Sequence, residues 1–226
     1  MSVAVPSFYE PVPILDVERE AEVGTTRPVD HDADDLPFSK LDGRRFEILA
    51  YHLTSNTQTS PGTVVTLVKA SGDQGRDVTV HVSGTLATII QCKNHMAPVS
   101  RPALLQELVK LLLFNLQEKY LPNGVVTYEL WAPGGASGPV EKLLTEWPNS
   151  VDDDEIRRTF ETVTKKYTSL SAVKWGEQEN YVLDMLRSPN PAASKDRSGS
   201  QPSNQGRLPV ACTLLPSGDR DVTGSL

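Results

Sequence analysis

The sequence contains only two cysteines, Cys92 and Cys212, which lie far apart and in unlike surroundings. They cannot build a disulfide framework, and the four histidines show no spacing that would complete a zinc site with them. Disulfides are also rare in proteins that fold in a reducing compartment. We therefore expect neither disulfides nor zinc, and this cysteine usage favours a reducing cytosol.

Long apolar runs are also missing. The longest, Leu108–Leu116, is interrupted by Lys110 and Asn115 and is too short to span a bilayer. The N-terminus lacks the positive start and apolar core of a secretory signal. These absences predict a cytoplasmic protein without membrane contact.

Basic charge is not in excess, because the formal net charge is −7 at pH 7. Residues 1–38 hold nine acidic and two basic residues, whereas residues 39–187 hold seventeen acidic and sixteen basic residues. The negative charge is therefore an N-terminal property of a nearly neutral body. No basic field indicates a nucleic-acid partner, so any such binding would be local.

Composition divides the chain into three parts. Residues 1–35 are acidic and contain early prolines, which predicts a disordered lead-in. Residues 188–226 are dominated by Ser, Pro, Gly, Asn and Asp, which predicts a disordered tail. We expect one folded domain over residues 36–187.

Hydrophobic periodicity predicts an α/β core in that domain. Ser39 is the expected N-cap of a first helix, whose buried stripe would include Phe46 and Leu53. Ser100 is the expected N-cap of a long leucine-rich helix. The expected strands are 64–70, the two arms of a hairpin within 72–93, and 125–131.

These elements predict a mixed central sheet of about four strands, flanked by helices, in the order α-β-β-β-α-β. A helix between two strands indicates a crossover, so strand 125–131 should run parallel to one hairpin strand. Additional C-terminal helices are expected over 140–147 and 153–167, with Asp152 capping the second.

Residues 72–95 are expected to form a turn and a β-hairpin that carry the candidate site residues. If Ser83-Gly84-Thr85 forms the hairpin loop, Val82 lies opposite Leu86, and Asp77 lies opposite Gln91. Strand alternation returns Lys93 to the same face. An acid, an amide and an amine would then converge, although a slip of one residue would separate Asp77 from Gln91.

Other site types fit the sequence less well. A calcium loop starting at Asp73 would need a glutamate where Gly84 stands. The glycine-rich segment 133–139 matches neither a phosphate-binding loop nor a hydrolase nucleophile elbow. The acidic run at Asp152 is better explained by helix capping, and Cys92 by burial in the core.

The remaining pattern suits phosphodiester cleavage. Asp77 could anchor Mg²⁺, and the Lys93 amine could orient the attacking water and offset phosphate charge. Glu47 in the first helix could be either a solvated helix carboxylate or a further metal ligand. On spacing alone, a purely structural hairpin remains an alternative.

The chain also resembles the Mrr-type branch of the restriction-endonuclease-like (PD-(D/E)xK) superfamily. The resemblance is carried by Phe46-Glu47, by the Gly-Asp-x-Gly-x-Asp turn ending at Asp77, and by Gln91-x-Lys93, over about residues 38–131. It implies a restriction-endonuclease-like fold. Arg76 departs from the pattern, since many relatives have an apolar residue there.

Residue roles follow from the resemblance. It implies that Asp77, Gln91 and Glu47 hold the metal, and that Lys93 is the catalytic lysine. Gln91 replaces the usual second acid, so Glu47 must supply the second carboxylate. The resemblance implies Mg²⁺ as cofactor, with Mn²⁺ as an alternative.

The function implied is a metal-dependent DNA endonuclease, in bacterial restriction or anti-phage defence. Such domains often work with sensing or ATPase modules, so a partner subunit or a homodimer is expected. Two alternatives stay open: a catalytically silent binding or scaffold domain, and a nuclease acting on RNA.

Overall fold

The computed structural model describes residues 41–68, 74–122 and 126–187, the strand 210–214, and the single positions Asp16 and Arg19. The expected disordered lead-in, most of the expected tail, and Asp73 in the turn before Asp77 lie outside the described residues.

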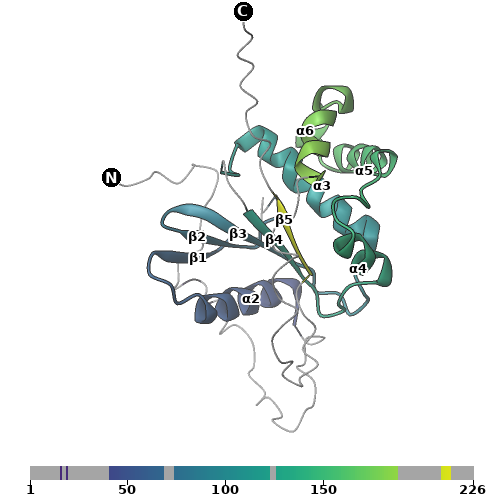
Figure 1. The fold of residues 1–226 in the computed structure, drawn as a ribbon. Helices are drawn as coiled ribbons and strands as arrows, with labels where there is room; N and C mark the ends of the chain where they lie inside the picture. The colour runs from purple at the N-terminus through teal and green to yellow at the C-terminus, as the bar shows by residue number, and fades with distance from the viewer. Residues whose placement is uncertain are drawn as a thin grey trace, which may run out of the picture.

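A helix is followed by three strands, a second long helix and a further strand, and helices dominate the part of the chain after that (Figure 1). The elements are α2 (Gly43–Thr57), β1 (Thr63–Leu67), β2 (Val78–Val82), β3 (Thr85–Cys92), α3 (Arg101–Glu118), β4 (Val126–Trp131), α4 (Gly138–Thr145), α5 (Asp153–Lys166), the 3₁₀ turn η2 (Thr168–Leu170), α6 (Trp175–Arg187) and β5 (Val210–Leu214).

The sheet has the strand order β1-β2-β3-β4-β5. The pairs β1–β2, β2–β3 and β4–β5 are antiparallel, whereas β3 and β4 are parallel. Parallel neighbours need a crossover connection, and α3 supplies it. The predicted mixed sheet, its crossover and the order α-β-β-β-α-β are therefore confirmed.

Strand β5 was not expected. Its residues fall within the predicted disordered tail, but the backbone of Val210–Leu214 pairs with β4 from Leu130 to Val126. Without β5, β4 would present an unpaired row of backbone donors and acceptors at the sheet edge. The sheet therefore has five strands rather than about four.

Side-chain caps define where the helices begin. The predicted caps Ser100 and Asp152 are confirmed: each accepts a hydrogen bond from the backbone N–H three residues later. The prediction of Ser39 for α2 was wrong, because Asp42 is the cap and accepts from the Arg45 N–H at 2.8 Å. A carboxylate there also interacts favourably with the positive end of the helix dipole.

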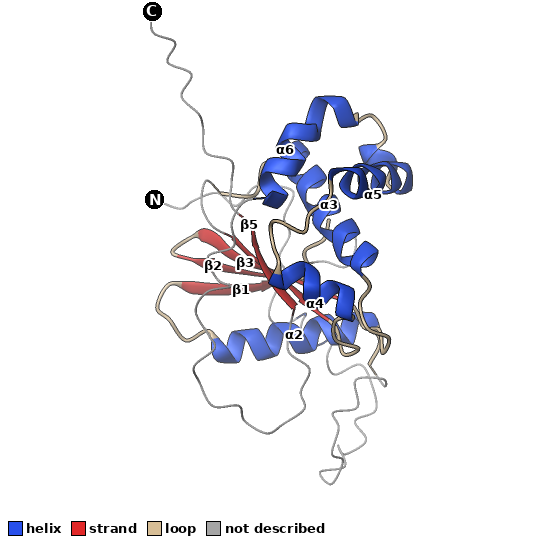
Figure 2. Cartoon of the chain, turned by 45° about the vertical axis from the view of Figure 1, so that its right-hand side comes forward, coloured by secondary structure: helices blue, strands red, loops and turns tan. Residues whose placement is uncertain are grey.

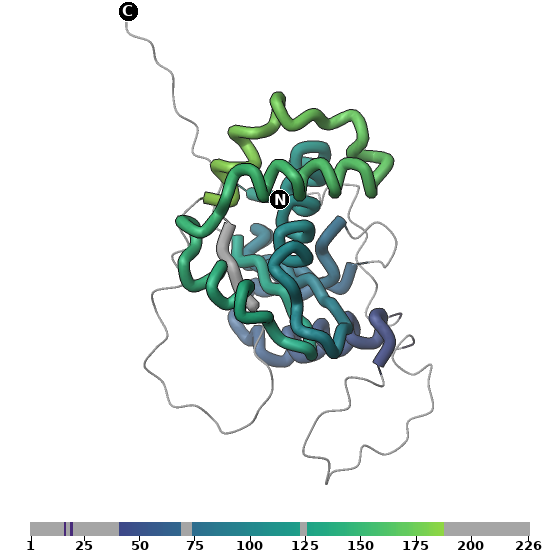
Figure 3. Tube along the Cα trace, turned by 90° about the vertical axis from the view of Figure 1, so that its right-hand side faces the viewer, coloured from purple at the N-terminus to yellow at the C-terminus, as the bar shows by residue number. Residues whose placement is uncertain are grey.

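Helix α2 lies on one side of the sheet and α3 on the other (Figure 2), and an apolar cluster fills each of the two faces. The smaller one joins α2 to the sheet and contains Phe46, Ile48, Ala50, Leu67, Val78, Ile90 and Cys92. Leu53, predicted to be part of the buried stripe, is 45% exposed, and Ile48 is buried instead. The larger cluster joins the other face to α3 and the C-terminal helices, with α5 and α6 lying outside α3 (Figure 3).

Helix α3 is the central element of the larger cluster. Nine of its residues are buried, and one of them is the charged Lys110, only 5% exposed. Among the residues that the structure describes, no helix is long and apolar enough to cross a membrane. A lysine buried in an apolar helix face needs a partner, and the candidate site supplies one.

Candidate active site

The β2–β3 hairpin brings Asp77 opposite Gln91, as predicted, but the turn and the pairing next to it differ from the prediction. The turn is a two-residue loop, with Val82 opposite Thr85 rather than Leu86. Ser83 (φ 51°) and Gly84 (φ 80°) both have positive φ, as a tight type I′ hairpin turn requires.

A bulge then restores the predicted alignment. The register shifts between Val80 and His81, so that Val80 pairs with Thr88 and Val78 pairs with Ile90. The extra residue on β3 compensates for the shorter loop. Beyond the bulge the register is the predicted one, and Asp77 lies beside Gln91.

Asp77 is held between two strands and is 2% exposed. Its N–H donates to Ile90 O at 2.9 Å, and its carbonyl accepts from Val68 N–H at 2.8 Å. Its Oδ2 accepts from Gln91 Nε2 at 2.5 Å and from the Cys92 N–H at 2.6 Å. The carboxylate is therefore fixed at the end of the hairpin and kept away from bulk water.

Gln91 is 3% exposed, and its two amide atoms differ in their surroundings. Nε2 donates to Asp77, whereas Oε1 is buried without a hydrogen-bond partner among the described residues. A buried acceptor left unsatisfied is unusual in a folded protein. The amide carbonyl is thus available to a ligand, and rotation of the amide group would exchange its two ends.

Lys93 lies two residues further on the same face and points to helix α3. Its ammonium forms an ion pair with Glu107 Oε1 at 2.8 Å. The other oxygen of Glu107 lies 2.5 Å from the Lys110 ammonium. Burial raises the pKa of Glu107, but Lys110 and Lys93 outweigh it, so the pKa lies below its ordinary value. Glu107 is therefore the charged link between two lysines.

Glu47 approaches from the opposite face of the sheet, because it lies on α2. Arg44 Nη1 donates to Glu47 Oε2 at 2.9 Å and to Val68 O at 2.9 Å. Val68 is also the residue whose N–H bonds to the Asp77 carbonyl. A single arginine therefore connects Glu47 to the strand end beside Asp77.

The start of α2 is fixed to the same end of the sheet. Asn94, just after β3, donates through Nδ2 to Leu41 O at 2.5 Å. The effect of nearby charges on Cys92 indicates the same proximity. Burial raises the pKa of the Cys92 thiol well above its ordinary value, Asp77 and Glu47 raise it further, and Lys93 lowers it. The Cys92 N–H donates to Asp77 and Lys93 is the next residue, so both charges lie beside this buried residue.

Arg76 explains how the turn before Asp77 is held. It is 3% exposed, its guanidinium lies 3.8 Å from the centre of the Tyr120 ring, and it pairs with Glu118 at 3.6 Å. Its Nη2 also donates to Gln74 Oε1 at 2.7 Å. Arg76 thus binds the turn to the end of α3.

The donor atoms suit a hard divalent cation. Among the described residues, no three His, Cys, Asp or Glu side chains are grouped to hold a metal. The candidate ligands are instead the carboxylates of Asp77 and Glu47 and the unsatisfied Gln91 carbonyl, and oxygen is what Mg²⁺ prefers. The donor chemistry of Asp77 and Gln91 suits such an ion if the Gln91 amide turns its oxygen toward Asp77, whereas Glu47 comes from α2 on the other face of the sheet.

Sequence reasoning did not find Glu107 and Lys110. Lys110 was noted only as an interruption of an apolar run. An acid and a lysine three positions apart on a leucine-rich helix face were the available signal, since such pairs lie side by side on a helix.

A comparison with protein-family models matches residues 38–121 to the Mrr catalytic domain, described as a restriction endonuclease. The match covers less than half of the 226-residue chain. It runs from just before α2 to just after α3 and includes all four predicted site residues, Glu47, Asp77, Gln91 and Lys93. No curated protein and no solved structure matches the chain.

Proposed function

We propose that this chain, whose residues 38–121 match the Mrr catalytic domain, hydrolyses DNA phosphodiester bonds with the help of a divalent metal ion. One observation carries the proposal. The Asp77 carboxylate and the Gln91 amide meet at 2.5 Å at the end of the hairpin, inside the matched segment.

Asp77, Glu47 and the Gln91 carbonyl are the proposed metal ligands. A bound Mg²⁺ or Mn²⁺ would lower the pKa of a water molecule and neutralise charge on the phosphate. The burial of Asp77 supports a fixed ligand position, and the unsatisfied Gln91 oxygen supports a third ligand. Glu47 supplies the second negative charge, which the neutral amide cannot.

Lys93 is the proposed catalytic lysine. Its side chain is 28% exposed, so its ammonium can reach both the protein and a bound substrate. A positive charge there would orient the attacking water and stabilise the charge that develops on the phosphate. Its ion pair with Glu107 keeps the amine on the face shared with Gln91.

The proposed setting is bacterial restriction or anti-phage defence in the cytoplasm. The nearly neutral body supplies little long-range attraction to DNA, whose backbone dominates binding affinity. We therefore propose that target choice depends on a second copy of the chain or on a sensing or ATPase subunit.

A silent binding or scaffold domain is the second candidate. Asp77 Oδ2 already accepts two short hydrogen bonds, and Lys93 and Glu47 each pair with another charged residue. These contacts would stabilise the fold without a metal. If the domain binds no divalent ion, these contacts favour a silent binding or scaffold domain over a nuclease.

The test is cleavage of supercoiled plasmid by the full chain with Mg²⁺ or Mn²⁺, beside Asp77→Asn and Lys93→Ala. Asp154→Asn on α5, an exposed carboxylate away from the hairpin, is the matched control. We expect cleavage by wild type and control only. Single-stranded DNA and RNA substrates separate the RNA-nuclease alternative, and calorimetry with Mn²⁺ separates a silent domain from an active one. Equal cleavage by wild type and both site variants would contradict the proposal.

A further inference from the structure

We propose that Glu107 is a positioning residue for Lys93, and that Lys110 holds Glu107 in place. The inference rests on the proposed function in so far as Lys93 acts on a phosphate. Its structural part, that Glu107 fixes the Lys93 amine, stands independently of activity.

Both carboxylate oxygens of Glu107 are engaged by different lysines. Oε1 lies 2.8 Å from Lys93 Nζ, and Oε2 lies 2.5 Å from Lys110 Nζ. The Glu107 side chain is 13% exposed and that of Lys110 is 7% exposed. Rotation of the carboxylate away from Lys93 would also break the contact with a buried ammonium, so the geometry of the three groups is coupled.

The network adjoins the proposed metal ligands. A methyl group built on Gly75 would lie 3.0 Å from Lys110 Cε and 3.7 Å from both Lys110 Nζ and Gln91 Oε1. The Lys110 side chain therefore lies against Gly75, in the turn that precedes Asp77, at a place that the Gln91 carbonyl also borders. The three charged residues connect α3 to both arms of the hairpin.

Stability alone is a poor explanation for a charged network that includes Lys110, a buried lysine on an apolar helix. Burial of ion pairs costs desolvation energy, and well-packed apolar residues often stabilise equally well. A lysine, in contrast, carries its ammonium on a flexible four-carbon side chain. The ammonium therefore has a defined position only when a partner binds it. The Glu107–Lys110 pair can hold the Lys93 amine in place, whereas apolar residues at these two positions could not.

Loss of this positioning should reduce cleavage more than binding. Small displacements of a group that acts on the reacting atoms cost about a hundredfold in rate. We therefore expect Glu107→Gln to lower the single-turnover cleavage rate by about tenfold to a hundredfold, with little change in the Mn²⁺ affinity. Glu107→Asp keeps the charge on a shorter side chain and should recover part of the rate.

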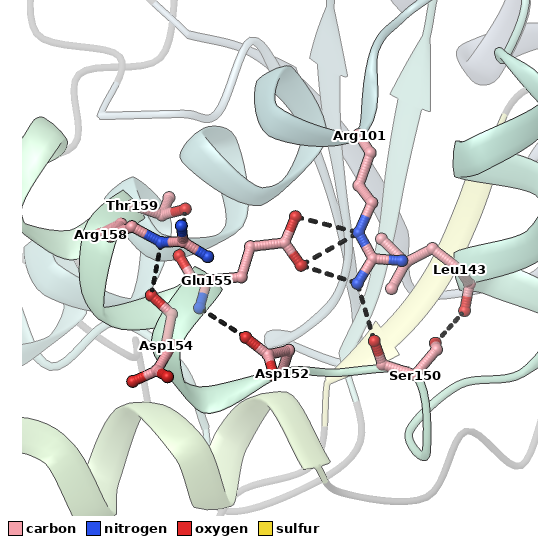
Figure 4. Close-up of polar contacts among 8 residues, drawn as sticks. All are labelled: Arg101, Leu143, Ser150, Asp152, Asp154, Glu155, Arg158 and Thr159. Atoms are coloured by element: carbon pink, nitrogen blue, oxygen red, sulfur yellow. Dashed lines mark hydrogen bonds and ion pairs between the residues drawn. The ribbon is translucent and has the colours of Figure 1, made fainter.

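The matched control is Glu155→Gln. Glu155 also pairs with a cation of α3, because its carboxylate accepts three hydrogen bonds from Arg101 at 2.7 to 3.0 Å (Figure 4). Its removal breaks an ion pair between α5 and Arg101, the first residue of α3, six positions before Glu107 on that helix. It therefore reports the effect of a weakened α3 contact without a change at the hairpin.

The experiment has two readouts on the full chain. The first is the rate at which an amine-acylating reagent modifies Lys93 in the metal-free protein at one fixed pH, measured by peptide mass spectrometry. The second is single-turnover cleavage of plasmid DNA with Mn²⁺. We expect Glu107→Gln to raise Lys93 modification several-fold and to lower cleavage, and Glu155→Gln to do neither.

Unchanged Lys93 modification in Glu107→Gln would overturn the proposal. So would a wild-type cleavage rate in Glu107→Gln while Lys93→Ala is inactive. If the wild type cleaves no nucleic acid, the proposed function fails, and the modification rates alone decide the role of Glu107. If Glu107→Gln does not fold, the double variant Glu107→Gln/Lys110→Gln removes the leftover charge and supplies the same comparison.

Discussion

The guanidinium carbon of Arg76 lies 3.8 Å from the centre of the Tyr120 ring, and the Tyr120 hydroxyl donates to Leu111 O at 2.6 Å. The residue next to Asp77 is thereby anchored to α3. Tyr120→Leu removes the ring under a buried cation, a contact worth about 2 kcal/mol when desolvated. We expect a clear loss in the free energy of unfolding, measured by urea denaturation.

Tyr120→Phe is the matched variant for this contact. It keeps the ring beneath Arg76 and removes only the hydrogen bond to Leu111, which should cost about 1 kcal/mol. The order of stability should therefore be wild type, Tyr120→Phe, Tyr120→Leu. Equal losses in the two variants would show that the ring contact contributes nothing.

Gly75→Ala should destabilise the turn that carries Asp77. Gly75 has φ +90°, a conformation that costs an alanine about 1 to 3 kcal/mol. The added methyl group would also press on Lys110 at 3.0 Å. Thermal unfolding measures the effect. Gly43→Ala, with no atom within 4 Å of the added carbon, is the control and should leave the melting temperature unchanged or slightly raised.

The loss of folding stability at low pH should depend on Glu107. Its folded-state pKa lies below the ordinary value, so the folded state binds this proton less readily than the unfolded state. Its contribution is therefore complete above the unfolded-state pKa and is lost as pH falls through the folded-state pKa. Urea denaturation between pH 7 and pH 3 should show this loss in wild type.

Glu107→Gln provides the comparison for this loss of stability at low pH. A neutral amide has no such proton to bind, so the difference in stability between wild type and variant should shrink as the pH falls below about 4.5. A difference that stays constant across this range would contradict the lowered pKa.

Cys92 should resist alkylation in the folded protein. Burial raises the pKa of its thiol, and the nearby Asp77 and Glu47 carboxylates raise it further. Since the thiolate is the reactive form, iodoacetamide at pH 8 should modify Cys92 slowly in the native state and rapidly in urea. Mass spectrometry of the peptide containing Cys92 measures both rates. Rapid modification without denaturant would contradict the burial.

The pairing of Asp77 with Gln91 could be predicted because strand alternation and a short turn leave few registers. The prediction that Val82 faces Leu86 was wrong, since Ser83 and Gly84 form a two-residue turn. The bulge after Val80 then returned the alignment to the predicted one. Sequence patterns predict the face of a residue better than they predict the turn that places it there.

The rest of the site depends on contacts between elements far apart in sequence. The partner of Lys93 is Glu107, and whether a helix acid faces solvent or a strand end depends on how α3 lies on the sheet. Strand β5 was missed for a similar reason. Five residues in a polar segment become a strand only because β4 offers an edge.

The parallel neighbour of β3 lies outside the matched segment. Residues 38–121 end before β4, yet Gln91 and Cys92 pair along the backbone with Leu130 and Trp131. A fragment that ends at residue 121 would lack β4. Strand β3, which carries Gln91, would then lose its backbone hydrogen bonds on that side, and the apolar face of α3 would be uncovered. The unit that is recognised in sequence comparison is therefore smaller than the unit that must fold together, and an expressed fragment should extend at least through β4.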